Sequence, residues 1–313
     1  MTDAPPHNCR VDSLSRGEFH RRLAGAGIGV TIGPFNVRIQ ARVSDLDRPL
    51  YDLYCDYPLL PEESVFSFHI VLQESRTFRP WFRRLVRFSV DGRAPHEDMP
   101  IAHALPVLEW GLNLVIALRS HCFLMLHAAV LERNGRSILL PAAPGYGKTT
   151  LCAAMAHRGW RLLSDEFGLV RPDTCDLIAI PRPMALKNES IEIFRAFAPD
   201  AYIGPEVSGT RKGRVAHVKV PADCVRRQSI SAPAAMIVFP RWVEKAETVI
   251  EKIGKAEGFM LLATNAFNYE LLGESGFRTV GELVDGADCY TLVYSDLADA
   301  TSLLIDLADR DEG

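Results

Sequence analysis

The sequence lacks the features of a secreted, membrane-bound or zinc-binding protein. Its seven cysteines, at positions 9, 55, 122, 152, 175, 224 and 289, form no CxxC pair and are odd in number, which argues against a disulfide framework or a zinc site. The first residues contain no apolar run of the signal-peptide type. The most apolar span, 102–129, is interrupted by Glu109, Arg119 and His121, and we interpret it as a buried helix followed by a strand. We therefore expect a cytoplasmic protein without membrane contact.

An excess of basic residues is also absent. The formal net charge of the 313-residue chain is -4, so nucleic acid is not an expected partner. Hydrophobic residues make up 48% and charged residues 24% of the chain, which is typical of a globular protein. The length suits one large domain or two ordinary ones.

Two sequence patterns divide the chain. Residues ~11 to ~95 are predicted to be rich in β-structure, and a helix is predicted over 103–120. After Cys122, predicted strands and helices alternate, which indicates an α/β nucleotide-binding core. We predict a β-rich N-terminal domain with its connecting helix at 1–110 and an α/β domain at 111–313. The predicted strands are 35–43, 65–72, 84–90, 123–132, 136–141, 160–164, 166–170, 177–180 and 289–294, and the later helices are 148–158, 258–272, 276–285 and 296–308.

The stretch from Pro141 to Thr150, PAAPGYGKTT, resembles a phosphate-binding loop with one departure. A predicted strand precedes it and a predicted helix begins at Lys148, which is the context that such a loop needs. The first glycine of the GxxxxGK[ST] pattern is replaced by Ala142, whose methyl group is tolerable if its φ is negative. We judge the loop intact and predict nucleotide binding by Ala143, Pro144, Gly145, Tyr146, Gly147, Lys148, Thr149 and Thr150.

An acidic pair follows the loop helix. In RLLSDE, Asp165 and Glu166 end a predicted strand, as in a Walker B arrangement, where one carboxylate holds Mg²⁺ and the other accepts a proton. We predict that Thr149 and Asp165 bind Mg²⁺. Glu166 is the first choice for the catalytic base and Asp165 the alternative.

Three further sequence features contain candidate residues. His127, in LMLHAAVL, lies on the strand before the loop, where a lone histidine is usually a core residue. The basic segment GTRKG, 209–213, can close over a triphosphate and place Arg211 or Lys212 on developing charge, or it is a solvated loop. Lys187 and Asn188 either contact phosphates or the acceptor, or Asn188 caps a helix that starts at Ser190.

Together these motifs resemble HPr kinase/phosphorylase, and more closely the bacterial HPr-kinase-related kinase A group. His127 lies fifteen residues before Ala142, and Asp165 lies seventeen residues after Lys148, as in that family. The likeness to HPr kinase covers roughly 123–190. The likeness to the related group also includes PRPMALKNES (181–190), GTRKGRVAHV (209–218), FPR (239–241) and NAFNYELLG (265–273). The HPr-binding signature is not recognisable after residue 190.

The resemblance implies a P-loop core of the HPr-kinase and phosphoenolpyruvate-carboxykinase type that uses ATP and Mg²⁺. It also implies transfer to a hydroxyl acceptor, most plausibly a serine of a protein or peptide, and a possible homo-oligomer. His127 would orient an acid or touch the γ-phosphate. Two other functions stay open, a nucleotide-sensing adaptor with little or no turnover and a small-molecule kinase. The sequence leaves open the acceptor, a reverse phosphorylase activity and the choice between Mg²⁺ and Mn²⁺.

Overall fold

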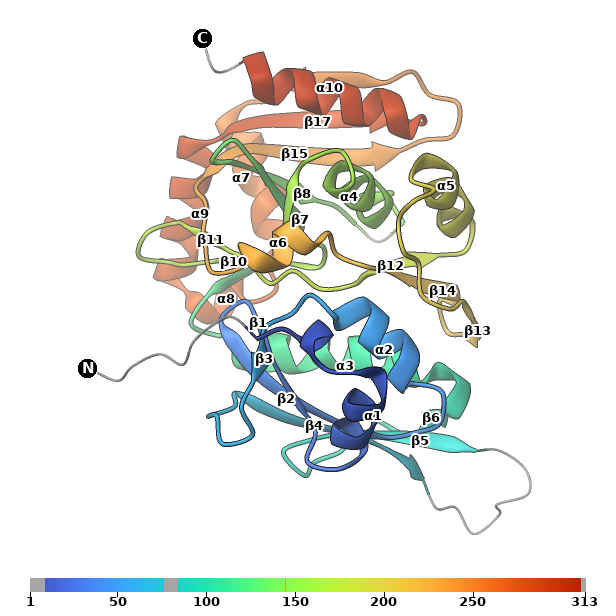
Figure 1. Cartoon of the computed structure of the whole chain (residues 1–313). Helices are drawn as coiled ribbons and strands as arrows, with labels where there is room; N and C mark the ends of the chain where they lie inside the picture. Colours follow the sequence, from blue (N-terminus) through green and yellow to red (C-terminus); the bar gives the residue numbers. More distant parts are fainter. Residues whose placement is uncertain (1–8, 76–83, 144, 311–313) are drawn as a thin grey trace.

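The computed structural model describes residues 9–75, 84–143 and 145–310. Within these residues the chain has a mixed α/β fold with three β-sheets and helices packed around them (Figure 1). Pro144, one of the predicted nucleotide-binding residues, lies outside the described residues.

The first sheet is built from the N-terminal third of the chain. Only β2 and β4 run parallel in it, while the other neighbours are antiparallel. Buried and more exposed residues alternate along β2, as its sequence pattern predicts. In spatial order the strands are β3 (Leu59–Leu60), β1 (Ile28–Ile32), β2 (Phe35–Arg42), β4 (Phe68–Ser75), β5 (Leu85–Val90) and β6 (Met99–Pro100).

Three helical segments of this region were not predicted. They are the 3-10 helix η1 (Val11–Ser13), α1 (Arg16–Ala24) and α2 (Asp47–Tyr54). Helix α1 packs on β1 and β2, and the Ser15 side chain accepts a hydrogen bond from the Glu18 amide at its N-terminus. Strand β4 begins three residues later than predicted.

The predicted helix at 103–120 is confirmed as η2 (Ile101–His103) followed by α3 (Ala104–Arg119). This segment is long and apolar enough to cross a membrane, but 61% of it is buried inside the protein. Helix α3 packs on β4, β5 and β6, and strand β7 follows it. It is therefore a core helix followed by a strand, as the sequence indicated.

The second sheet carries most of the predicted site. Strands β8, β15 and β17 are parallel, and the other paired strands are antiparallel. In spatial order the strands are β11 (Leu177–Ile178), β10 (Phe167–Val170), β7 (Leu124–Arg133), β8 (Arg136–Pro141), β15 (Ala234–Trp242), β17 (Asp288–Tyr294) and β16 (Val249–Lys252), and β9 (Arg161–Ser164) also pairs with β7.

Helices cover this sheet on both faces. The apolar residues of α4 (Lys148–Ala156) and α10 (Leu297–Arg310) belong to one core cluster, and those of α7 (Lys255–Thr264) and α9 (Glu274–Gly286) belong to another. Along β7, Leu124 and Leu126 belong to the α9 cluster, while Met125 and Ala129 belong to the α4 cluster. Burial on both faces explains the continuous apolar run of β7. Alternation along the strand also directs His127 to the α4 face.

A third, small antiparallel sheet lies between the first sheet and α4 (Figure 1). Its strands, in spatial order, are β12 (Met184–Lys187), β14 (Gly213–Val218) and β13 (Val207–Thr210). Helix α5 (Glu189–Phe197) follows β12, and α6 (Ala222–Arg226) follows β14. The 210–213 turn between β13 and β14 carries the basic residues of the GTRKG segment.

The helix predicted over 258–272 is wrong as one element. It is divided into α7 and α8 (Tyr269–Leu272), because the segment between them attaches to β7. There Asn268 accepts a hydrogen bond from the Met125 amide and donates one to the Phe123 carbonyl oxygen. The predicted boundary at 110/111 falls inside α3, and a core cluster includes residues of both the first and the second sheet. The division into two domains stays a prediction.

Candidate active site

The loop between β8 and α4 has the backbone that its glycines require. Gly145 and Gly147 have φ values of 91° and 81°, which favour glycine. A Cβ atom on Gly147 would overlap the Tyr294 hydroxyl, which donates a 3.2 Å hydrogen bond to the Gly147 carbonyl oxygen. Ala142 is buried and is not among the described residues with positive φ. The methyl group in place of the first glycine is therefore accommodated.

Lys148 and the two threonines after it open α4. Amides in the first turn of a helix have no intrahelical acceptor and present positive charge to an anion. The Lys148 side chain is buried and its Nζ donates a hydrogen bond to the backbone carbonyl oxygen of Asp165. The Thr149 hydroxyl lies near the Asp165 carboxylate and contributes to lowering its pKa. The structure thus brings together the loop and the acidic pair that the sequence placed seventeen residues apart.

Asp165 and Glu166 occupy the connection between β9 and β10 but differ in surroundings. Asp165 Oδ1 is buried and has no hydrogen-bond partner among the described residues. Burial raises the pKa of Asp165, although Lys148 partly offsets this effect. Burial also raises the pKa of Glu166, but Lys148 and then His127 lower it more, so it lies below its ordinary value. Glu166 is 40% exposed.

His127 lies beside Glu166, with 4.0 Å between Nε2 and Oε1. Its neighbour across the sheet is Phe167, the residue after Glu166. Burial and the charge of Lys148 lower the pKa of His127, which keeps the imidazole neutral at pH 7. Its ring also packs against that of Phe267, with centroids 5.5 Å apart. His127 therefore lies with Lys148, Asp165 and Glu166 in the candidate site rather than in the hydrophobic core.

Two lysines of the third sheet add positive charge to this cluster. The charges of Lys187, at the end of β12, and Lys212, in the β13–β14 turn, both contribute to the lowered pKa of Glu166. Burial, followed by the charge of Lys212, lowers the pKa of Lys187. Lys212 Nζ also lies 5.6 Å from the ring centroid of Trp110. Arg211 is exposed. Lys212 is thus a turn cation whose charge reaches Glu166, and Lys187 is the functional candidate that the sequence left undecided.

The remaining predicted loop residues lie at the surface. Ala143 and Tyr146 are exposed, and Thr150 is half-buried. Tyr146 is fixed from the β15 side, because its carbonyl oxygen accepts a hydrogen bond from the Trp242 amide and its ring lies 5.9 Å from the guanidinium carbon of Arg241. The FPR segment of the sequence therefore supports the loop, a role that its pattern alone does not reveal.

A groove opens beside Glu166. Its volume is about 840 Å³, and its walls come from α3, from Phe167 and from the segment 263–271. Leu118, Phe267 and Leu271 line it and are 57%, 56% and 69% exposed. Sequence analysis did not find this groove, because its walls come from segments that are about 150 residues apart in the chain.

The residues present fit a magnesium ion bound together with phosphates. An orphaned carboxylate oxygen of Asp165 lies beside the Thr149 hydroxyl, and Mg²⁺ in phosphoryl-transfer sites often uses one or two protein ligands plus substrate phosphates. In the described part of the chain no three His, Cys, Asp or Glu side chains gather as a metal cluster. Such a site would therefore depend on a bound nucleotide for most of its ligands.

Comparison with known proteins gives limited information. No family model and no curated protein matches the chain. Among solved structures, the HPr(Ser) kinase/phosphatase from Coxiella burnetii matches 60% of this chain and 99% of its own, with 12% sequence identity and a TM-score of 0.28. The likeness is weak. The residues of the site therefore carry the functional argument.

Proposed function

We propose that the protein is an ATP-dependent kinase that transfers the γ-phosphate of Mg-ATP to a hydroxyl group, with a serine of a protein or peptide as the acceptor. The observation that carries this proposal is the convergence of the N-terminus of α4 on the acidic pair. Lys148 and Thr149 contact Asp165 from that helix, and Glu166 lies next to it.

The loop and the lysines would hold the triphosphate. The amides of Gly145 to Thr150 and the N-terminal end of α4 favour negative charge. Lys148 would exchange its contact with the Asp165 carbonyl oxygen for the β- and γ-phosphates. Thr149 and Asp165 would hold Mg²⁺, which neutralises charge on the phosphates. Lys187 and Lys212 add positive charge where charge develops on the transferred group.

Glu166 would act on the acceptor. With a pKa below its ordinary value it is ionised at neutral pH, so it can accept a hydrogen bond from the acceptor hydroxyl. As the hydroxyl oxygen bonds to the γ-phosphorus and the bond to the β–γ bridging oxygen breaks, the hydroxyl proton passes to Glu166. Neutral His127, 4.0 Å away, would orient that carboxylate. Asp165 is the weaker candidate for the base, because its Oδ1 atom is shielded from solvent and its carboxylate lies near Thr149.

The groove supports a polypeptide acceptor. A small-molecule kinase would need an enclosed polar acceptor pocket, whereas the groove at Glu166 is lined by exposed apolar side chains such as Phe267 and Leu271. A peptide segment that places a serine hydroxyl at Glu166 and apolar side chains against these residues would use both features.

Incubation with γ-labelled ATP and Mg²⁺ in a lysate of the source organism tests this function. We expect a labelled protein or peptide that is lost with Lys148→Ala and with Glu166→Gln but kept with Glu251→Gln, an exposed carboxylate on β16. Label only in small molecules would indicate a metabolite kinase. ATP binding without any transfer would indicate a nucleotide-sensing adaptor. Unchanged Mg-ATP affinity in Lys148→Ala would contradict the loop assignment.

A further inference from the structure

Asn188, the residue after Lys187, has an unusual backbone. Its φ of 53° and ψ of -124° are values that glycine adopts readily and that other residues adopt at a cost of about 1–3 kcal/mol. It precedes α5 at the N-cap position, but its side chain makes no capping hydrogen bond there. One of the two alternatives from the sequence was that Asn188 caps a helix starting at Ser190. Asn188 does occupy the N-cap position, of a helix that starts at Glu189, but its side chain bonds to other partners.

Those partners are backbone groups of the β13–β14 turn. Asn188 Oδ1 accepts a 3.0 Å hydrogen bond from the Arg214 amide, and Nδ2 donates a 3.3 Å bond to the Lys212 carbonyl oxygen. The Asn188 amide in turn donates to the Arg214 carbonyl oxygen, at 3.0 Å. Gly213 is necessary for this contact, because a Cβ atom there would overlap Asn188 Oδ1. The side-chain amide of Asn188 thus bonds to the residue before Gly213 and to the residue after it.

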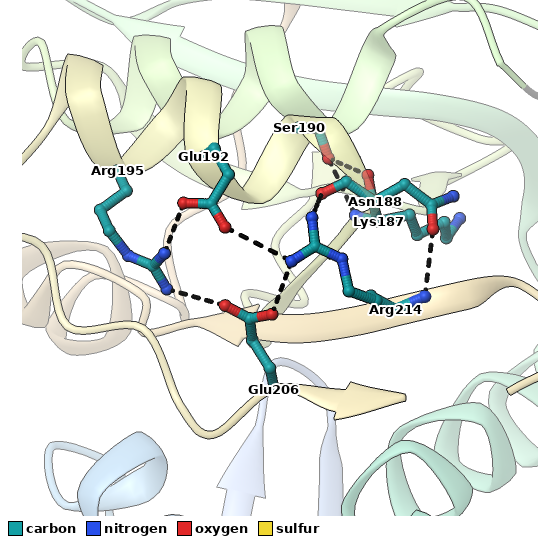
Figure 2. A network of polar contacts seen from close by, with 7 residues as sticks. All are labelled: Lys187, Asn188, Ser190, Glu192, Arg195, Glu206 and Arg214. Carbon is teal, nitrogen blue, oxygen red and sulfur yellow. Dashed lines mark hydrogen bonds and ion pairs between the residues drawn. The ribbon is translucent and has the colours of Figure 1, made fainter. Parts of the chain in front are cut away.

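A second set of contacts holds the end of β12 and the start of β14 in place (Figure 2). Ser190 Oγ accepts a 2.8 Å hydrogen bond from the Lys187 amide and donates a 2.7 Å bond to the Lys187 carbonyl oxygen. Arg214 pairs with Glu206 at 3.0 Å and with Glu192 at 3.4 Å. Arg195 pairs with the same two carboxylates, so the strand end, α5 and the turn form one connected network.

We propose that Asn188 is a positioning residue that holds Lys187 and Lys212 at the transferred phosphate. Lys187 is its neighbour in the chain, and Lys212 is tied to it through the carbonyl hydrogen bond. Both cations act on Glu166. The last registered pair of β12 and β14 is Lys187 with Val215, so Lys212 lies beyond it in the turn, where the Asn188 side chain adds a further tie. The strained backbone brings the side-chain amide of Asn188 into reach of the backbone of Lys212 and Arg214. This inference rests on the proposed kinase function and adds a residue to it.

The variant Asn188→Gly separates positioning from stability. Glycine adopts the same backbone without strain, so the melting temperature should stay equal or rise, while both side-chain hydrogen bonds are lost. We expect faster hydrogen exchange of the Arg214 amide, a fall in kcat for ATP hydrolysis of about ten- to hundredfold, and a smaller change in the Kd of Mg-ATP. Asp45→Gly is the matched control, because Asp45 is an exposed residue with φ of 62° in the first-sheet region. It should leave kcat and exchange at Arg214 unchanged.

The outcomes distinguish this inference from the proposed function. If wild-type protein hydrolyses Mg-ATP and Asn188→Gly keeps the wild-type kcat, the positioning role is wrong while the kinase proposal stands. A lower kcat accompanied by a marked fall in melting temperature would overturn it in favour of a purely structural role. Absence of any turnover in wild-type protein would overturn the kinase proposal and this role with it.

Discussion

At the scale of single residues, the acidic pair shows how two neighbours acquire different properties. Asp165 is half-buried, with its Oδ1 atom shielded from solvent near Lys148 and Thr149, whereas Glu166 faces the groove and His127. Burial raises the pKa of Asp165, and nearby positive charge lowers that of Glu166. Separated pKa values of this kind are typical of carboxylates with different catalytic roles. The sequence identified the pair, but it could not tell which carboxylate has an oxygen shielded from solvent.

This difference predicts opposite effects on stability. The pKa of Asp165 is higher in the folded than in the unfolded chain, so its ionisation destabilises the folded state as the pH rises past the unfolded value of about 3.9. Asp165→Asn should therefore melt at a higher temperature than wild-type protein at pH 7. The advantage should disappear below about pH 4, which thermal denaturation across pH can measure.

Glu166 supplies the contrasting variant. Because its folded pKa is lowered, its ionised form stabilises the protein above the unfolded pKa, and this contribution is lost as the pH falls through the folded value. Glu166→Gln should melt at a lower temperature than wild type at pH 7. If Glu166→Gln and Asp165→Asn show equal pH profiles of melting temperature, the assignment of different surroundings to the two carboxylates is contradicted.

Mg-ATP binding should depend on Asp165. Mg-ATP at a hundred times its Kd should add about 2.7 kcal/mol to the stability of wild-type protein but little to that of Asp165→Asn.

At the scale of elements, the groove is a joint product of α3 and the α7–α8 connection. Leu271 is 69% exposed at the groove, and a carboxylate there would make apolar docking unfavourable without touching the nucleotide site. Leu271→Asp should lower labelling of a polypeptide acceptor about tenfold, with unchanged ATP hydrolysis. Labelling assays at several acceptor concentrations measure this change.

A matched control is available on α7. Met260 is 64% exposed and does not line the groove. Met260→Asp therefore introduces the same negative charge at a nearby exposed apolar residue without affecting docking. Equal loss of labelling in both variants would indicate a general effect on folding. Full labelling in Leu271→Asp would place the acceptor elsewhere.

The elements that the sequence predicted well are those with strong local patterns. Strands β7 and β8, helix α4 and the turn at Gly147 follow from apolar runs and glycines. The third sheet was missed because β12 and β13 have only four residues each. The break between α7 and α8 was missed because Asn268 bonds to β7, which is a tertiary contact. The role of Asn188 depends on a backbone φ that a residue pattern does not display.

At the scale of the whole molecule, the two large sheets are joined by both apolar and polar contacts. One core cluster includes Ile70 of β4 and Leu151 of α4. The Tyr57 hydroxyl donates a 2.9 Å hydrogen bond to the Pro181 carbonyl oxygen, and Gln228 bonds to the backbone of Thr31 and Gly33. Contacts of this kind favour unfolding of the chain as one cooperative unit.

Cooperative unfolding predicts a long-range effect of the nucleotide. Saturating Mg-ATP binds only the α4 side, yet it should slow hydrogen exchange of globally protected β4 amides by about a hundredfold at a hundred times the Kd, because exchange there requires unfolding of the whole unit. Hydrogen exchange with mass spectrometry measures this, and Lys148→Ala serves as the control that should show no slowing. If exchange in β4 is indifferent to Mg-ATP while exchange in α4 slows, the first sheet unfolds on its own. The boundary predicted from the sequence would then describe two separate domains, with the nucleotide site confined to the second.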